Sequence, residues 1–152
     1  MEFYNAINGP QWTVRTGWGY VNNCTVSWVG VTCTSTSLIF SLPSNSLSGT
    51  LPDSLSQIVT LQTLNLNLNK IQGTLPASWK TLVKLSSLNI MNNALNGTLP
   101  DAWKAMFVIT TLYLANNNLT GKLPASLGGP WRSINSIDVH SNSLSGRSQR
   151  PG

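Results

Sequence analysis

The sequence predicts an α/β solenoid in which a short strand and a helical turn repeat along the chain. Asn45, Asn69, Asn93 and Asn117 recur every 24 residues, and Asn142 follows after 25. A Gly lies four residues after each of these Asn residues, and a Leu-Pro pair follows the first four Gly residues. A fixed period of this length indicates an array of units, each of which packs mainly against its neighbours.

Each unit carries an alternating apolar stretch just before its Asn. In the second unit this stretch supplies Leu61, Leu64 and Leu66, and the same spacing returns in the third, fourth and fifth units. Alternation of this kind predicts a short strand with one buried face. Units stacked in register then form a parallel sheet. Because a buried amide without partners is costly, each repeated Asn must be hydrogen-bonded.

The frame over residues 38 to 146 resembles the plant-type leucine-rich repeat, LxxLxLxxNxLxGxLPxxWxxL. The resemblance implies a right-handed leucine-rich repeat solenoid with a parallel β-sheet on its concave face and short 3-10 or helical turns on its convex face. It also implies that the repeated Asn side chains form a structural ladder between neighbouring turns. The predicted ladder consists of Asn45, Asn69, Asn93, Asn117 and Asn142.

The Leu-Pro pairs are expected to lead into the convex turns, because Pro lacks a backbone donor and holds its predecessor in extended geometry. Asp53 and Asp101 follow two of these pairs, where an acidic group suits the start of a helical turn. Trp79 and Trp103 occupy the same repeat position. We therefore expect the two indoles to stack in the convex half of the core, with Leu55 and Leu127 in the equivalent places.

Residues 1–36 are expected to form an N-terminal cap that covers the apolar end of the array. Their aromatic-rich segment resembles the cap of plant-type repeat proteins. The expected elements are a helix near 2 to 8, a loop carrying Trp12 and Trp18, and a strand near 26 to 32.

The cap contains both cysteines, Cys24 and Cys33. The resemblance implies a disulfide between them, although eight residues separate them here where family members commonly have six. With one His and no second Cys pair, a zinc site has too few ligands. A disulfide in turn favours an oxidising compartment.

The five repeats span residues 37–146, and a basic tail occupies 147–152. The last unit lacks a Leu-Pro pair, so its apolar positions are expected to leave an open end that Trp131 partly covers. We expect either that the array continues in a longer protein or that two copies associate through this end. The apolar positions concerned are Ile134, Ile137, Val139 and Leu144.

Composition excludes several classes of function. Charged residues make up 9% of the chain and the net charge is +5, without the basic run of a nucleic-acid binder. No apolar stretch is long enough to predict a membrane span, and no charged-then-apolar leader opens the chain, so any signal peptide is expected to have been removed.

Three glycosylation sequons support an extracellular location. Asn96 and Asn118 are the favoured acceptors, and Asn23, beside Cys24, is the less favoured one.

Function is expected on positions that the repeat does not determine. Outward-facing residues of successive strands should form columns of hydroxyls and amides, with a few apolar anchors. Concave sheets of this kind commonly bind partners in solenoid proteins. The predicted contact residues are Thr63, Asn65, Asn67, Leu68, Ser87, Asn89, Met91, Asn92, Thr111, Tyr113, Asn116, Asp138 and His140.

The sequence contains one arrangement that resembles a catalytic triad. Asp138, His140 and Ser141 lie within four residues, but neighbouring side chains on one face of an open strand point outward in parallel. Nothing in the sequence supplies an oxyanion hole. We therefore expect no enzymatic activity, no cofactor and no metal.

The predicted function is an extracellular or cell-surface recognition module that binds a protein, peptide or glycan on its concave face. Two alternatives remain open: an inhibitor of a secreted cell-wall-degrading enzyme, as in polygalacturonase-inhibiting proteins, and an ice-binding protein. The repeats LPASWKTL and LPDAWKAM also look like those of kinetoplastid or other protist surface antigens. That likeness implies a secreted or lipid-anchored surface protein.

Overall fold

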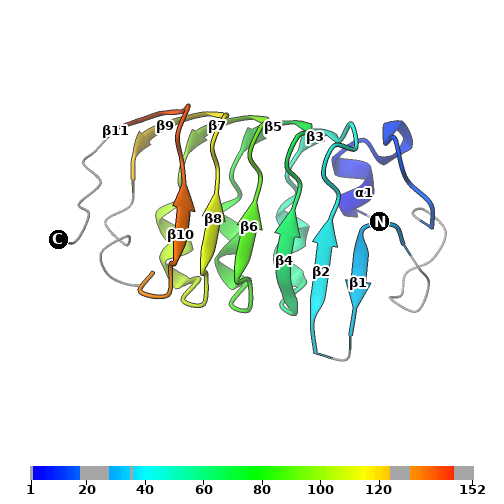
Figure 1. Ribbon diagram of the computed structural model, residues 1–152, viewed down its shortest axis with the longest axis horizontal. Helices are drawn as coiled ribbons and strands as arrows, with labels where there is room; N and C mark the ends of the chain where they lie inside the picture. The colour runs from blue at the N-terminus through cyan, green and yellow to red at the C-terminus, as the bar shows by residue number, and fades with distance from the viewer. Residues whose placement is uncertain (1, 18–27, 35, 124–130, 146–152) are drawn as a thin grey trace.

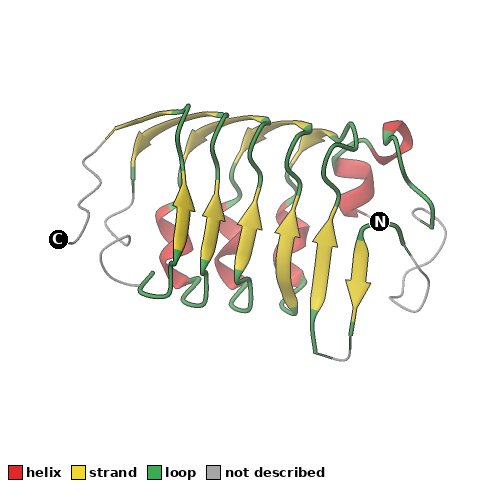
Figure 2. Cartoon of the chain, viewed as in Figure 1, coloured by secondary structure: helices red, strands yellow, loops and turns green. Residues whose placement is uncertain are grey.

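The computed structural model describes residues 2–17, 28–34, 36–123 and 131–145. Within these residues the chain winds into a solenoid with two sheets and a row of 3-10 turns (Figures 1 and 2). No helix in this part of the chain is long and apolar enough to cross a membrane.

The six-stranded sheet consists of the cap strand β1 and the five repeat strands that the alternating apolar residues predict, in the order β1-β2-β4-β6-β8-β10. All its pairings are parallel except β1 with β2, which is antiparallel. Equivalent residues of successive repeats stand side by side, as with Leu64 and Leu88. The strands are β1 (Val31–Cys33), β2 (Leu38–Ser41), β4 (Leu61–Asn65), β6 (Ser87–Asn89), β8 (Thr111–Tyr113) and β10 (Ser136–Asp138).

A second parallel sheet, with strand order β11-β9-β7-β5-β3, was not expected from the sequence. Its strands follow the ladder Asn of each repeat, and β3, β5, β7 and β9 contain the repeated Gly. Each central strand has a single buried apolar residue, and the next inward position is the repeated Gly, so the sequence gives only a weak strand signal. The strands are β3 (Ser48–Thr50), β5 (Lys70–Thr74), β7 (Ala94–Thr98), β9 (Asn118–Lys122) and β11 (Ser143–Ser145).

Short 3-10 helices follow the first three Leu-Pro pairs, as predicted: η2 (Asp53–Gln57), η3 (Ala77–Thr81) and η4 (Asp101–Ala105). Figure 2 shows these turns behind the six-stranded sheet. Trp79 and Trp103 are fully buried and stack with ring centroids 6.0 Å apart and planes within 3°. Each indole also donates to a Pro carbonyl of the preceding repeat, Trp79 to Pro52 at 3.1 Å and Trp103 to Pro76 at 2.8 Å.

The ladder of Asn side chains is present, as the resemblance implied. Asn69 shows the pattern: its Oδ1 accepts from the backbone N–H of Asn45 and Leu47, while its Nδ2 donates to the carbonyls of Leu42 and Leu66. Asn93, Asn117 and Asn142 likewise join neighbouring turns. These residues therefore satisfy backbone groups that stacking alone leaves unpaired.

The cap covers the first repeat with buried aromatic rings. Phe3 lies in α1 (Glu2–Ala6), and its ring centroid is 5.4 Å from that of Phe40 in β2. Trp12 follows η1 (Gly9–Gln11), is buried, and donates its indole N–H to the carbonyl of Ile7 at 2.9 Å. Gly49 lies under this cap at φ +90, where a Cβ would come within 2.3 Å of the Ala6 carbonyl oxygen.

Two expectations about the cap need correction. The helix ends at Ala6, before the predicted residue 8, because Asn8 adopts a left-handed conformation. The cap strand begins at Val31, not near 26, because a turn closed by the Val31 N–H and the Trp28 carbonyl precedes it. Gly30 permits that turn: its φ is +80, and a Cβ there would lie 2.4 Å from the Ser41 carbonyl oxygen.

The last described repeat leaves apolar surface exposed, since Ile137 is 40% exposed. The expectation that Trp131 covers this end is wrong. Trp131 is 3% exposed and donates its indole N–H to the carbonyl of Trp103 in the preceding repeat. The Trp131 carbonyl accepts from the Ile134 N–H, and the Met106 carbonyl accepts from the Ile109 N–H in the same way. Trp131 is therefore the repeat equivalent of Met106 and is buried like it. Leu127 and the tail at 147–152 lie outside the described residues.

Candidate ligand-binding face

The candidate binding face is the outward surface of the six-stranded sheet, which we call the strand face. Leu64, Leu88 and Leu112 point into the core, and the residues on either side of each one point outward. One outward column consists of Thr63, Ser87, Thr111 and Ser136, and the other of Asn65, Asn89, Tyr113 and Asp138. All eight residues are partly exposed, as the sequence predicts.

The second column has a feature that the sequence pattern does not reveal. The Oδ1 atoms of Asn65 and Asn89 each accept a hydrogen bond from the backbone N–H two residues later, at 3.3 and 3.2 Å. Asp138 uses its Oδ1 in the same way toward the His140 N–H, at 3.2 Å. Because both amide oxygens are turned back onto the backbone, the Nδ2 groups of Asn65 and Asn89 have no acceptor among the described residues.

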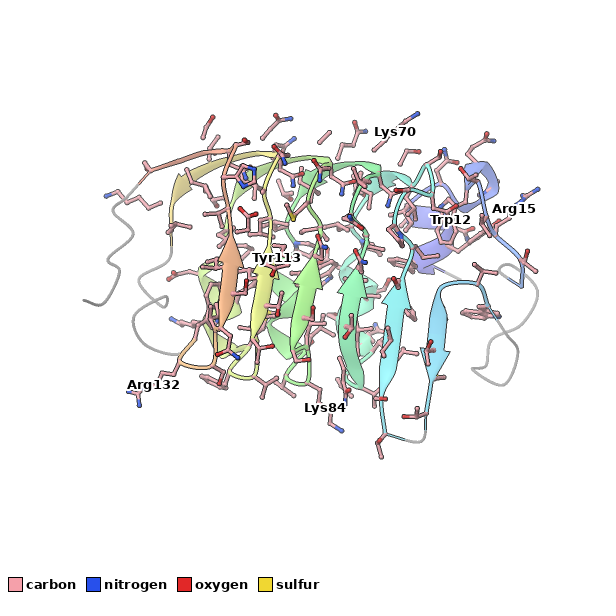
Figure 3. The ribbon with its side chains drawn as sticks, viewed as in Figure 1. Trp12, Arg15, Lys70, Lys84, Tyr113 and Arg132 are labelled. Atoms are coloured by element: carbon pink, nitrogen blue, oxygen red, sulfur yellow. The ribbon has the colours of Figure 1, made fainter. Side chains whose placement is uncertain are left out.

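Tyr113 lies in the same column at the end of β8, the strand next to the last in the sheet (Figure 3). Its hydroxyl forms a 2.8 Å hydrogen bond with the Ser136 Oγ on the neighbouring strand β10. The side chain therefore extends across the sheet instead of standing away from it. Ser136 was not among the predicted contact residues, although it is the repeat equivalent of Thr111, which was.

Several predicted contact residues lie beyond the strands, and this corrects the expectation that they form columns on the sheet. Asn67, Met91 and His140 follow the ends of β4, β6 and β10. Leu68, Asn92 and Asn116 occupy the next turn with φ of 57, 55 and 55. A strand cannot continue through a left-handed residue, so these side chains border the strand face at one edge.

Asp138 and His140 form the single ion pair among the described residues, with 2.5 Å between Asp138 Oδ1 and His140 Nδ1. The hydrogen bond from the His140 side chain holds the pKa of Asp138 below its ordinary value of 3.8. Ser141 lies in the left-handed turn after β10, and no hydrogen bond joins it to His140. These three residues are therefore not arranged as a catalytic triad.

Two of the predicted glycosylation acceptors lie away from the strand face. Asn96 and Asn118 are exposed on the second sheet, where they are paired neighbours on β7 and β9. Cys33 ends β1 and is a half-cystine. Its predicted partner Cys24 and the third acceptor Asn23 lie outside the described residues, so the pairing and all three glycans stay predictions.

Comparison with known proteins agrees with this architecture. The leucine-rich repeat family model matches residues 60–82, 84–106 and 109–130. No curated protein matches the chain. Among solved structures, the BIR2 ectodomain from Arabidopsis thaliana is 29% identical with a TM-score of 0.83, covering 96% of this chain and 81% of that one.

Two further structures share the fold. Pollen Receptor Kinase 3 is 29% identical with a TM-score of 0.71, covering 82% of this chain and 61% of its own. The Arabidopsis receptor kinase HAESA, solved with the peptide hormone IDA and the co-receptor SERK1, is 27% identical with a TM-score of 0.56. That match covers 68% of this chain and 22% of HAESA. These comparisons give no support to the likeness to kinetoplastid surface antigens.

Proposed function

We propose that this leucine-rich repeat chain, similar to the ectodomains of plant receptors, is a non-enzymatic extracellular recognition module that binds its partner on the strand face. The observation that carries the proposal is the column of Asn65 and Asn89, whose amide N–H groups point outward without an acceptor. A partly exposed donor on a sheet is available to a ligand at little desolvation cost. The similar receptor HAESA, solved with a peptide hormone and a co-receptor, favours a peptide or protein partner.

The polar groups of the face restrict the chemistry of the partner. Asn65 and Asn89 can donate but their oxygens are already used, so the ligand must present acceptors there, such as carbonyl, carboxylate or hydroxyl oxygens. Asp138 lies three strands from Asn65 and supplies the one carboxylate of the face. A ligand bound along the column therefore places its acceptors near Asn65 and Asn89 and any cationic group near Asp138.

The experiment uses the substitutions Asn65→Asp and Asn89→Asp together. Asp138 shows that a carboxylate in this column makes the same bond to the backbone N–H two residues later. The double variant is therefore expected to fold normally while it presents an acceptor in place of each outward donor. Immobilised wild-type protein is first screened against libraries of secreted peptides and cell-surface glycans.

For a partner found in this way, we expect the double variant to weaken binding at least about tenfold, since each lost charge-neutral hydrogen bond contributes about 1 kcal/mol. Asn118→Asp, on the exposed second sheet, is the matched control and should leave affinity unchanged. If binding survives in the double variant and falls in the control, the site lies on the second sheet and the proposal is wrong.

Extracellular location forms part of the proposal. It is supported by the exposure of Asn96 and Asn118 on the second sheet, away from the strand face, where glycans would not block a ligand. Expression in a secretory host, followed by glycosidase treatment and mass spectrometry of Asn96→Gln and Asn118→Gln, tests both acceptors. Loss of one glycan mass in each variant is the expected result.

A further inference from the structure

An exposed apolar row runs along one edge of the solenoid, at the turns that lead from the 3-10 helices into the six-stranded sheet. Val59, Val83 and Phe107 occupy the same position in three successive repeats. Their exposed fractions are 50%, 50% and 59%, and that of the adjacent Val108 is 43%. We call these four residues the apolar edge.

The fold itself does not need apolar side chains at these positions. Each residue of the row lies two places before a buried Leu or Ile, and backbone hydrogen bonds such as Leu85 N–H to the Leu82 carbonyl form the turn. A polar side chain there would cost little in packing, because about half of each side chain is already in contact with solvent. Single exposed apolar residues need no explanation, but a contiguous row on a soluble surface indicates a contact site.

Cations without ionic partners surround the apolar edge. Lys80 and Lys104 lie in the last turns of η3 and η4, next to these turns, and Lys84 follows Val83. Arg132 continues the row in the fifth repeat, and Figure 3 shows Lys84 and Arg132 pointing away from the same edge. Among the described residues the ion pair of Asp138 and His140 is the single one, so no carboxylate neutralises these four cations.

We propose that the apolar edge is a second contact site, which binds the surface of an anionic lipid membrane. Apolar side chains with flanking Lys and Arg are the combination that inserts at a bilayer interface while the cations reach anionic headgroups. The geometry fits an extended partner, because the tips of stacked turns about 4.8 Å apart form a row along one edge of the solenoid. This site is independent of the strand face and of its proposed ligand.

Flotation of the full chain with lipid vesicles tests the proposal. One set of vesicles contains phosphatidylcholine alone, and the other also contains phosphatidylglycerol. We expect wild-type protein to float with the anionic vesicles only and to dissociate as salt is raised. The apolar variant carries Val83→Ser and Phe107→Ser, and the charge variant carries Lys84→Gln and Lys104→Gln.

Each double variant should lower the partition coefficient on anionic vesicles about tenfold or more. The matched control carries Leu68→Asn and Lys70→Gln. Leu68 is 53% exposed, and Lys70 lies on the opposite edge in Figure 3. The control should bind like the wild type, and urea unfolding should show that all variants remain folded.

Three results would overturn the proposal. The first is wild-type protein that fails to bind anionic vesicles, which is also the result expected if the edge serves an acidic protein partner. The second is a control that weakens binding as much as the apolar variant does. The third is unchanged binding in the charge variant.

Discussion

The side chain of Asn45 holds the backbone of Val14 at two points. Its Oδ1 accepts from the Val14 N–H at 2.5 Å, and its Nδ2 donates to the Val14 carbonyl at 2.8 Å. Asn45 occupies the first position of the ladder, where no earlier repeat exists. The other ladder residues form side-chain hydrogen bonds to the preceding repeat, and Asn45 forms the corresponding hydrogen bonds to the cap.

Replacing Asn45 by Ala should destabilise the protein by about 2 kcal/mol, since two backbone groups of the cap lose their partners. Urea unfolding measures the change, and limited proteolysis should show earlier cleavage in the cap. Ser46→Ala removes an exposed hydroxyl contact to Thr13 Oγ1 at 3.1 Å and should change stability by less than about 0.5 kcal/mol. Equal effects of the two substitutions would contradict the role of Asn45.

Leu68 and Asn92 have the same left-handed backbone, with φ of 57 and 55. The left-handed conformation costs a residue such as Leu about 1 kcal/mol, and Asn tolerates this conformation better. Leu68→Asn should therefore stabilise the protein, and the reverse substitution Asn92→Leu should destabilise it by a similar amount. Thermal unfolding of both variants checks the prediction, which fails if the two changes have the same sign.

Trp103→Phe should cost about 2 kcal/mol. The variant loses the indole hydrogen bond to the Pro76 carbonyl and part of the stack with Trp79, and it leaves a cavity in the convex half of the core. Lys104→Ala, on the exposed side of the same 3-10 helix, is the control and should stay within about 0.5 kcal/mol. Urea denaturation of the two variants distinguishes core packing from a general effect of altering η4.

The pKa of Asp138 should rise toward its ordinary value of 3.8 in His140→Ala, because the side-chain hydrogen bond from His140 is the main cause of the lowering. A carboxyl group whose pKa is lower in the folded state than in the unfolded state stabilises the fold at pH values above its unfolded-state pKa. That stability is lost as the pH falls through the folded-state pKa. The wild type should therefore lose stability more steeply below pH 3.8 than His140→Ala.

An NMR titration of the Asp138 carboxyl carbon measures this shift directly. Ser141→Ala removes a hydroxyl that forms no bond to Asp138 and should leave the pKa of Asp138 unchanged. A pKa of Asp138 that is the same in wild type and in His140→Ala would show that the His140 ring does not control it.

The pairing of Cys24 with Cys33 remains a prediction with a simple test. A ring this short should contribute about 2 to 3 kcal/mol, concentrated in the cap. Replacing both residues by Ser should lower the free energy of unfolding by that amount, and reduction of the wild type should have the same effect. Detection of two free thiols by mass spectrometry of the native protein would refute the pairing.

The sequence was sufficient for the repeat period, the parallel sheet of the repeats and the turns after the Leu-Pro pairs, and the family resemblance that it carries implied the Asn ladder. These features depend on spacing: leucines that alternate must share a face, and an Asn that recurs every 24 residues must meet the same backbone groups each time. The outward positions of the strand face follow from the same alternation. Thr63, Asn65, Ser87, Asn89, Thr111 and Tyr113 were therefore identifiable as candidate contact residues.

Tertiary structure alone decided which groups those residues present. The Oδ1 of Asn65 is bound to a backbone N–H two residues later, and the Tyr113 hydroxyl is bound to Ser136 on the next strand. The second sheet, the left-handed turn at Leu68 and the place of Trp131 inside the stack also escaped the pattern. All of these depend on where backbone and side chains of neighbouring turns meet, and spacing along one chain does not encode those contacts.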